Sequence, residues 1–341
     1  MKEIIESIKN GYTGDTEKDT QYLLAQMEKY KDNQPVIREI YKLLYELLPQ
    51  DIKDNFVKTI NQDKFEERLH EIQDLVLNKD YKRALDYLDM AIEKIDKVYE
   101  DDKYVYMTFH NPFEAYYYAT IREDKSKIIK NSTLDFGVYH KFRGIILNNL
   151  KRYEEAEADF VESLKWNPLD FETIFEYADA LYQQKKYEEF YDFNIKTLKN
   201  AYTNYAIAMC YHNIGLYYMA KNTKKDDFIA YDVISYSISF AETDYAYRDL
   251  NTICEKYKMK KELAKQDDIF ACLKKNKLPL SPDEELVMNL IGIAQRFMNL
   301  NDEFALQVYK LVYQLTHDEI TLQYIKAGER IIQAKHQESN K

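Results

Sequence analysis

Apolar residues recur at helical spacing along most of the chain. Residues 35–49, PVIREIYKLLYELLP, place apolar side chains three and four positions apart, which is the period of an amphipathic helix. Residues 144–168, GIILNNLKRYEEAEADFVESLKWNP, show that period twice, with a tight turn between the two segments and a proline that ends the second. Only seven Gly and six Pro occur, too few for a turn-rich all-β protein. The pattern predicts helices joined in antiparallel pairs.

The helix pairs repeat at an interval of 34 residues. Four pairs of similar residues are separated by that interval: Tyr153 and Tyr187, Leu147 and Leu181, Leu164 and Leu198, and Ser163 and Thr197. Two helices that repeat every 34 residues are typical of tetratricopeptide repeats. Stacked side by side, such pairs form an all-α, right-handed superhelical array, which is the fold that we expect.

Small residues mark the positions where paired helices approach each other. Gly144 maps onto Ala178 at the 34-residue interval, and Gly215 follows 37 residues later. Ala156 is the expected small residue of the second helix. We expect Phe160, one turn further on, to fill the groove against the next unit.

The pattern divides the chain into six segments. They are an N-terminal helical cap (residues 1–62), a first tetratricopeptide-like unit (63–98), an irregular insertion or degenerate repeat (99–136), a main run of three units (137–242), a linking helix pair (243–280), and a C-terminal unit with a capping helix (281–341). In the last unit, Gly292 and Ala305 are the expected small pair, and Ser281 is the expected N-cap. The tyrosines at residues 116–118 either form a partner surface or pack the insertion onto its neighbours.

The order of several motifs resembles a known group of proteins. HNPFE with its tyrosines, LKRYEEA…LKWNP, CYHNIGLYY and LPLSPDEE…YKLVYQLTHDE occur in that order between about Tyr22 and Ile332. In this respect the chain resembles uncharacterised tetratricopeptide-repeat proteins of low-GC Gram-positive bacteria. The resemblance implies an all-helical bacterial protein and no particular activity.

Composition and charge narrow the classes of partner. The net charge of −11 disfavours nucleic acid, because binding to phosphates depends on Lys and Arg. The most basic stretch, residues 256–277, has eight lysines among carboxylates, and we interpret it as a solvated helical face. The start lacks the apolar core of a signal peptide, and no apolar run reaches the ~18 residues of a membrane span. Because three scattered cysteines form no disulfide framework, we expect a cytoplasmic protein without a membrane partner.

No motif predicts chemistry. The sequence contains no phosphate-binding glycine loop, G-x-S-x-G, H-E-x-x-H or C-x-x-C. Cys210 and His212 are two positions apart on a predicted helix, so their side chains diverge and cannot hold one metal ion. We therefore expect no catalytic, metal or cofactor site, and interpret the chain as a non-enzymatic protein.

A binding groove is the better expectation. In tetratricopeptide arrays the first helix of each unit lines the groove, and the spacing assigns nine positions to it: Lys141, Ile145, Asn148, Phe175, Asp179, Tyr182, His212, Leu216 and Met219. A clamp for a C-terminal carboxylate is not expected, since Ile145 and Asp179 replace the neutral polar groups that it needs. The lining fits a partly apolar or basic peptide better.

Two functions remain open. The first is a scaffold or adaptor that holds a protein or peptide in the groove. The alternative is a peptide-sensing regulator of transcription or signalling, with DNA-binding helices within residues 35–60. The charges of that segment cancel, which disfavours phosphate binding: they are Arg38, Lys42, Lys53 and Lys58 against Glu39, Glu46, Asp51 and Asp54.

Overall fold

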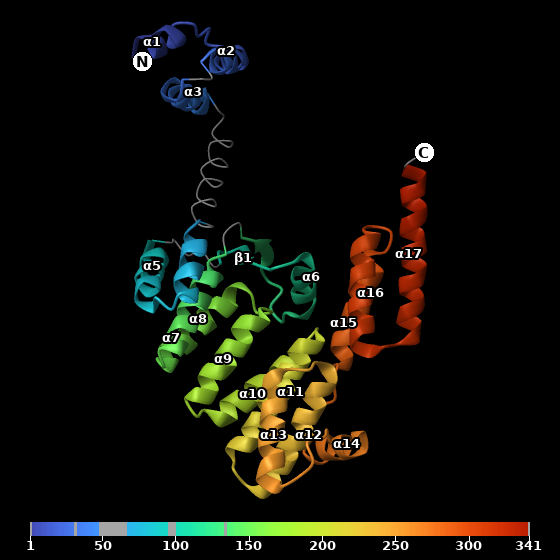
Figure 1. Ribbon diagram of the computed structural model, residues 1–341. Helices are drawn as coiled ribbons and strands as arrows, with labels where there is room; N and C mark the ends of the chain where they lie inside the picture. The colour runs from blue at the N-terminus through green and yellow to red at the C-terminus, as the bar shows by residue number, and fades with distance from the viewer. Residues whose placement is uncertain (1, 31–32, 48–66, 95–99, 133–134, 340–341) are drawn as a thin grey trace. The chain divides into compact units, whose positions relative to one another are not determined.

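The computed structural model describes residues 2–30, 33–47, 67–94, 100–132 and 135–339 (Figure 1). The chain divides into two compact units, Met1–Glu71 and Ile72–Lys341. The segments predicted at residues 1–62, 63–98 and 99–136 each lie partly outside the described residues, and their boundaries stay predictions.

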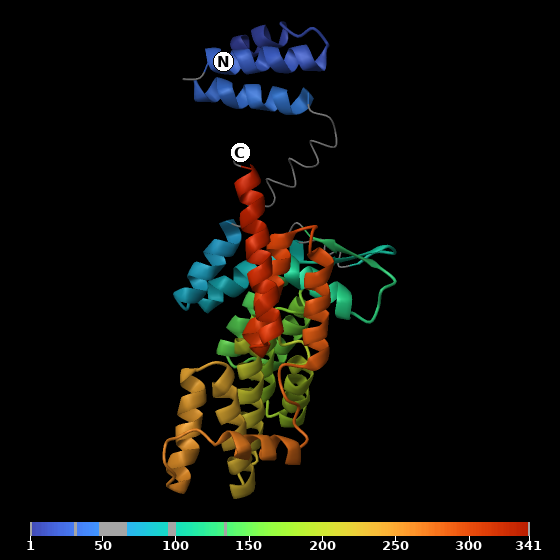
Figure 2. The same ribbon diagram turned by 90° about the vertical axis from the view of Figure 1, so that its right-hand side faces the viewer.

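The first unit contains three helices: α1 (Lys2–Lys9), α2 (Thr16–Lys29) and α3 (Gln34–Leu47). Both α1 and α2 pack against α3 (Figure 2), and Ile8, Leu23 and Ile40 are buried between them. The helix predicted after Pro35 is therefore present. The second helix of the possible DNA-binding pair falls on residues 48–66, outside the described residues, so that alternative stays a prediction.

The second unit is built mainly of helices that pack against their neighbours in sequence. After helical residues 72–77, the stack contains α5 (Tyr81–Lys94), α7 (Gly137–Asn149), α8 (Tyr153–Trp166), α9 (Phe171–Gln183), α10 (Tyr187–Leu198), α11 (Asn204–Ala220), α12 (Lys224–Phe240) and α13 (Asp244–Tyr257). Each of these from α7 onward packs on the helix before it, and α5 packs on α7 (Figure 1). This is an all-α solenoid, as the periodicity predicts.

The turns within the helix pairs repeat the same backbone conformation. Lys79, Lys151, Lys185 and Asn222 have positive φ, and each lies two residues before the second helix of its pair. A left-handed residue lets the chain reverse directly after a helix, and glycine usually provides it. Lys151 and Lys185 are 34 positions apart, so the backbone repeats at the interval that the side chains predict.

The small residues of the main run lie where the helices meet. A Cβ atom on Gly144 would be 2.5 Å from Cε1 of Phe160, which is fully buried. Gly215 meets Ile234 of α12 in the same way. Phe160 also joins Ala180 of the next pair in one apolar cluster. Phe160 therefore packs within its own pair and against the next.

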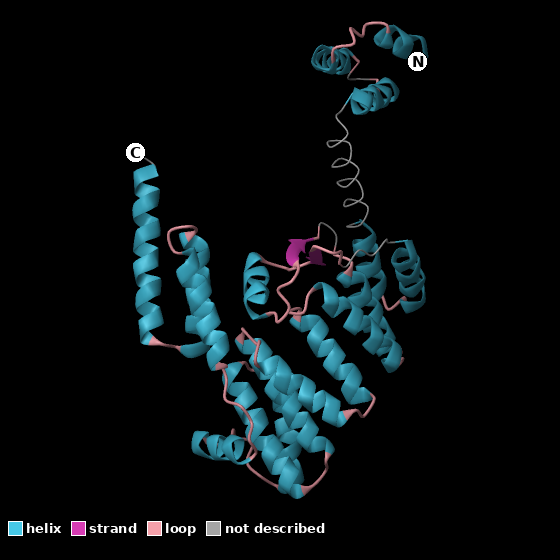
Figure 3. Ribbon diagram, turned by 180° about the vertical axis from the view of Figure 1, so that it is seen from behind, coloured by secondary structure: helices cyan, strands magenta, loops and turns pink. Residues whose placement is uncertain are grey.

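The insertion between α5 and α7 contains the exception to the helical pattern. Strands β1 (Tyr104–Met107) and β2 (Ile128–Asn131) pair in parallel, with Tyr104 opposite Ile128 (Figure 3). In the sequence, α6 (Pro112–Ile121) lies between the two strands. The backbone N–H of Thr108 donates to the carbonyl of Trp166 at 2.9 Å, which fixes this sheet to the end of α8.

A buried carboxylate attaches α6 to the array. Glu114 is 4% exposed, and it accepts four hydrogen bonds of 2.9–3.1 Å. The donors are the backbone N–H of His110 and the side chains of Asn111, Asn167 and Tyr202. These donors satisfy a charge that would otherwise be costly to bury.

The three adjacent tyrosines pack the insertion onto its neighbours. The hydroxyl of Tyr117 donates to Asn200, and the ring of Tyr118 contacts Phe109. Tyr116 contacts Phe297 and Phe304 of the C-terminal segment, with ring centroids 4.5 and 5.5 Å apart. These tyrosines therefore pack the insertion onto its neighbours, while Tyr116 stays 43% exposed; that they also form a partner surface stays a prediction.

After α12 the helices no longer pack only on the helix that precedes them in the sequence. Both α13 and α14 (Gln266–Lys275) pack on α12. The chain then passes Tyr211, whose hydroxyl donates to the carbonyl of Pro279 at 2.7 Å. It continues into α15 (Glu284–Phe297), α16 (Asp302–Thr316) and α17 (Glu319–Ser339), and α15 packs against α6 (Figure 1).

Two predictions for this last segment are wrong. Gly292 is exposed, and a Cβ atom there would have no atom of the rest of the described chain within 4 Å, so it is not a close-approach position. Ala294 is the small residue that α15 buries. The N-cap of α15 is Asp283 and not Ser281, because Asp283 accepts from the backbone N–H groups of Glu285 and Leu286.

Candidate functional site

Five of the nine predicted groove residues line one hollow of about 240 Å³. They are Phe175, Asp179 and Tyr182 of α9, and His212 and Leu216 of α11. The other lining residues come from α10, α11 and α13: Phe190, Met209, Asn213, Tyr245 and Arg248. We call this site the α9–α11–α13 hollow. That it binds a ligand stays a prediction.

Aromatic rings form much of its wall. Phe175 stacks on Phe171 and meets Tyr205 edge to face. The ring of Tyr182 contacts Phe190 at a centroid distance of 5.2 Å, and burial raises the pKa of its hydroxyl. Such a wall presents rigid apolar surface to an incoming side chain.

Asp179 and Arg248 provide opposite charges at this hollow. Asp179 accepts hydrogen bonds from Asn148 at 2.9 Å and from Gln183 at 3.1 Å. The side chain of Arg248 is 71% exposed, and its Nε donates to Asp249 at 3.2 Å. Arg248 is absent from the nine predicted residues because the spacing assigns residues 243–280 to a linking helix pair. The helix that follows Thr243 could have indicated another groove helix.

His212 is held by Asp249. Its Nε2 lies 2.9 Å from Oδ2 of Asp249, and the buried Nδ1 has no hydrogen-bond partner among the described residues. Burial alone would raise the pKa of Asp249, but hydrogen bonds from His212 and Arg248 outweigh it and hold this pKa below its usual value. The pairing fixes the imidazole at the border of α11 and α13.

The remaining four predicted residues lie elsewhere. Lys141 pairs with Asp170 and Glu172; burial alone would lower the pKa of Lys141, but these carboxylates raise it. Asn148 binds Asp179 from outside the hollow, while Ile145 packs beside Phe160 and Met219 packs against the main core. The structure therefore engages these four in contacts within the chain.

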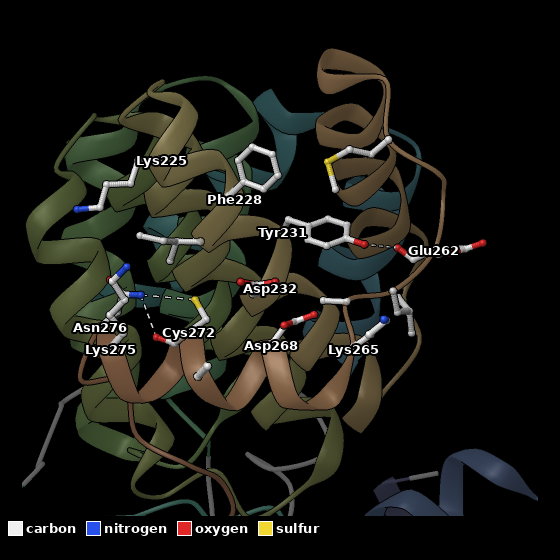
Figure 4. Close-up of a pocket in the computed structure, with 15 residues that line it drawn as sticks. Lys225, Phe228, Tyr231, Asp232, Glu262, Lys265, Asp268, Cys272, Lys275 and Asn276 are labelled. Carbon is white, nitrogen blue, oxygen red and sulfur yellow. Dashed lines mark hydrogen bonds between the residues drawn. The ribbon is translucent and has the colours of Figure 1, made fainter.

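A larger depression of about 680 Å³ lies between α12, α14 and the segment that connects α13 to α14 (Figure 4). We call it the α12–α14 trough. The charge pattern of residues 256–277 predicts a solvated helical face and gives no sign of this depression. Only the packing of α14 across α12 creates this site.

Other kinds of site are not evident in the described residues. No group of three or more His, Cys, Asp or Glu side chains in the described ranges could hold a metal ion. Cys210 is fully buried, and burial raises the pKa of its thiol. Within the described part of the chain, no helix has the length and apolar character to cross a membrane.

Comparisons with known proteins add little to what the helix packing shows. No family model matches the chain, and no curated protein matches it. Among solved structures, the chain is similar to the crystal structure of the P58(IPK) TPR domain, with 12% sequence identity and a TM-score of 0.28. The match covers 94% of this chain and 80% of that chain. The repeat fold rests on the helix packing and the recurring turns, and the likeness to proteins of Gram-positive bacteria stays a prediction.

Proposed function

We propose that this chain is a non-enzymatic, cytoplasmic scaffold that binds a protein or peptide segment in the α9–α11–α13 hollow. The observation that carries the proposal is that five positions chosen from repeat spacing line one hollow. Its volume of about 240 Å³ fits one or two side chains and not a whole small-molecule substrate, which usually needs ~300 Å³ or more.

The chemistry of the hollow supports an apolar anchor with polar neighbours. Phe175, Tyr182 and Leu216 favour an aromatic or aliphatic side chain. Beside that anchor, Asp179 favours a basic group of the ligand and Arg248 favours an acidic one. Because Asp179 repels a carboxylate, we expect no tight binding of a peptide that ends in EEVD, and titration with such a peptide tests this directly.

The main experiment compares partner capture by three forms of the full chain from a lysate of the source organism. Leu216→Arg fills the hollow with a charged side chain, and Val161→Arg makes the same kind of change on the exposed face of α8. A partner of the hollow is retained by the wild type and by Val161→Arg, and is lost from Leu216→Arg. The purified partner should then bind the wild type in a titration.

Two results would contradict the proposal. One is that every captured protein binds Leu216→Arg as well as the wild type. The other is turnover of a small molecule by the purified chain that Leu216→Arg abolishes. Circular dichroism of all three forms checks that the variants remain folded.

A further inference from the structure

The α12–α14 trough is formed by two helices that present matching stripes. Each stripe follows helical spacing, so its side chains lie on one face. On α12 the stripe is Lys225, Phe228, Ile229 and Asp232, and on α14 it is Asp268, Ala271, Cys272 and Lys275. The volume of the trough is about 680 Å³.

Apolar side chains remain exposed along the trough. Phe228 is 37% exposed and Leu263 is 43% exposed. The connecting segment is fixed in place, since Tyr231 donates to the carbonyl of Glu262 at 2.9 Å and Ser235 accepts from the N–H of Ala264 at 3.0 Å. The trough is therefore a preformed groove in which exposed apolar side chains lie beside charged ones.

Two carboxylates lie together in the middle of the trough. Figure 4 shows Asp232 of α12 and Asp268 of α14 side by side. No ion pair joins either carboxylate to a cation within the described residues. Burial raises the pKa of Asp232 and the charge of Asp268 adds to this effect, although the thiol of Cys272 partly offsets it by hydrogen bonding. A cation placed between them would relieve this repulsion.

Lysines limit where a second cation could bind. In Figure 4, Lys225 and Lys275 lie to one side of the two carboxylates and Lys265 to the other. A run of basic residues would bring positive charges against these lysines. The arrangement of charges therefore complements a segment with one isolated basic residue.

We propose that the α12–α14 trough binds an amphipathic helix of a partner protein that places a single Lys or Arg between Asp232 and Asp268. Apolar residues one turn before and after it contact Phe228 and Leu263, as in other complexes of a helix in a groove. This site is separate from the α9–α11–α13 hollow and does not depend on the function proposed for it.

The probe is a displayed library of 14-residue helical peptides. Leucines fixed at positions 4 and 11 provide the apolar stripe, and the other positions of that face, including 7 and 8, are randomised. The library is selected against the full wild-type chain. We expect the enriched peptides to contain one Lys or Arg at position 7 or 8.

Synthetic copies of the enriched peptides are then titrated against variants of the chain. Binding to Asp232→Asn/Asp268→Asn should be weaker by roughly tenfold or more, because the cation loses both partners. Exchange of the peptide's Arg for citrulline should cause a similar loss. The matched control is Asp192→Asn, which removes an exposed carboxylate of α10 and should bind as the wild type does.

Several outcomes would overturn the proposal. They are a failure to enrich any peptide, enrichment of peptides with no basic residue or with basic runs, and equal binding to the double variant. Self-association of the wild type that the double variant abolishes would instead assign the trough to a second copy of the chain. Leu216→Arg must retain peptide binding here, which separates this test from that of the hollow.

Discussion

The α7–α8 pair and the α15–α16 pair look alike in sequence but pack differently. Each has a glycine in its first helix and an acidic pair at the start of its second. Gly144 of α7 lies against Phe160, whereas Gly292 of α15 has no close neighbour among the described residues. The difference teaches that a small residue is required only where a large side chain of the second helix crosses the first. Elsewhere the same residue weakens its helix.

The largest expected effect concerns the ring that crosses Gly144. Phe160 is fully buried, so Phe160→Ala should lower the free energy of unfolding by about 3–5 kcal/mol. Val161 is the next residue of α8 and is 42% exposed, so Val161→Ala should change stability by less than about 0.5 kcal/mol. Urea unfolding measures both. Similar losses for the two variants would contradict the packing described for α7 and α8.

The two glycines should respond to alanine with opposite signs. Gly144→Ala places a methyl group against Phe160 and should lower the free energy of unfolding by about 1–2 kcal/mol, despite the better helix propensity of alanine. Gly292→Ala meets no neighbour and should raise it by about 0.5–1 kcal/mol. The same unfolding experiment decides this, and a shift of equal sign would remove the contrast between the two pairs.

The turns of the two pairs provide a smaller test. Lys151 has a φ of 61° and Asn299 a φ of 69°. Lysine is strained there and asparagine is tolerated, so Lys151→Gly should stabilise the chain by about 0.5–1 kcal/mol. Asn299→Gly should change stability by only about 0.3 kcal/mol or less. Thermal melting checks both, with Lys151→Ala as a control that retains the strain; equal gains at both turns would refute the explanation.

The smallest effects depend on pH and distinguish two carboxylates of the adjoining helices α12 and α13. The lowered pKa of Asp249 means that its stabilising contribution is present above the usual aspartate pKa of ~3.9 and is lost as pH falls through the folded value. The raised pKa of Asp232 has the opposite effect on stability. Its ionised carboxylate destabilises the fold as the pH rises above ~3.9 and through the folded value.

Melting temperatures from pH 3 to pH 8 measure these differences. Asp249→Asn should be less stable than the wild type near neutral pH, and Asp232→Asn should be at least as stable as the wild type. Both differences should shrink as the pH falls, first for Asp232, whose raised pKa lets it protonate at higher pH, and only below the usual aspartate pKa of ~3.9 for Asp249. A destabilised Asp232→Asn at pH 7 would show that its negative charge is already compensated within the fold.

Much of the helical array could be predicted from residue spacing. Gly144, Phe160 and Pro168 mark the small, large and terminating positions of one pair, and Leu147 and Leu181 show its repeat. The spacing also selected Phe175 and His212, which line the hollow with Leu216. It could not find Arg248, because residues 243–280 were taken to lie outside the groove. Nor could it find the strands of the insertion, which are short and form a two-stranded sheet.

Local periodicity in the sequence was enough to predict that helices form, that they recur in pairs and which of their faces are apolar. The three-dimensional packing was needed to show that α14 crosses α12, that α15 packs against α6, and that Asp232 meets Asp268. Those contacts join residues far apart in the chain. Their positions depend on the path of the backbone between helices, which the spacing within each helix does not record.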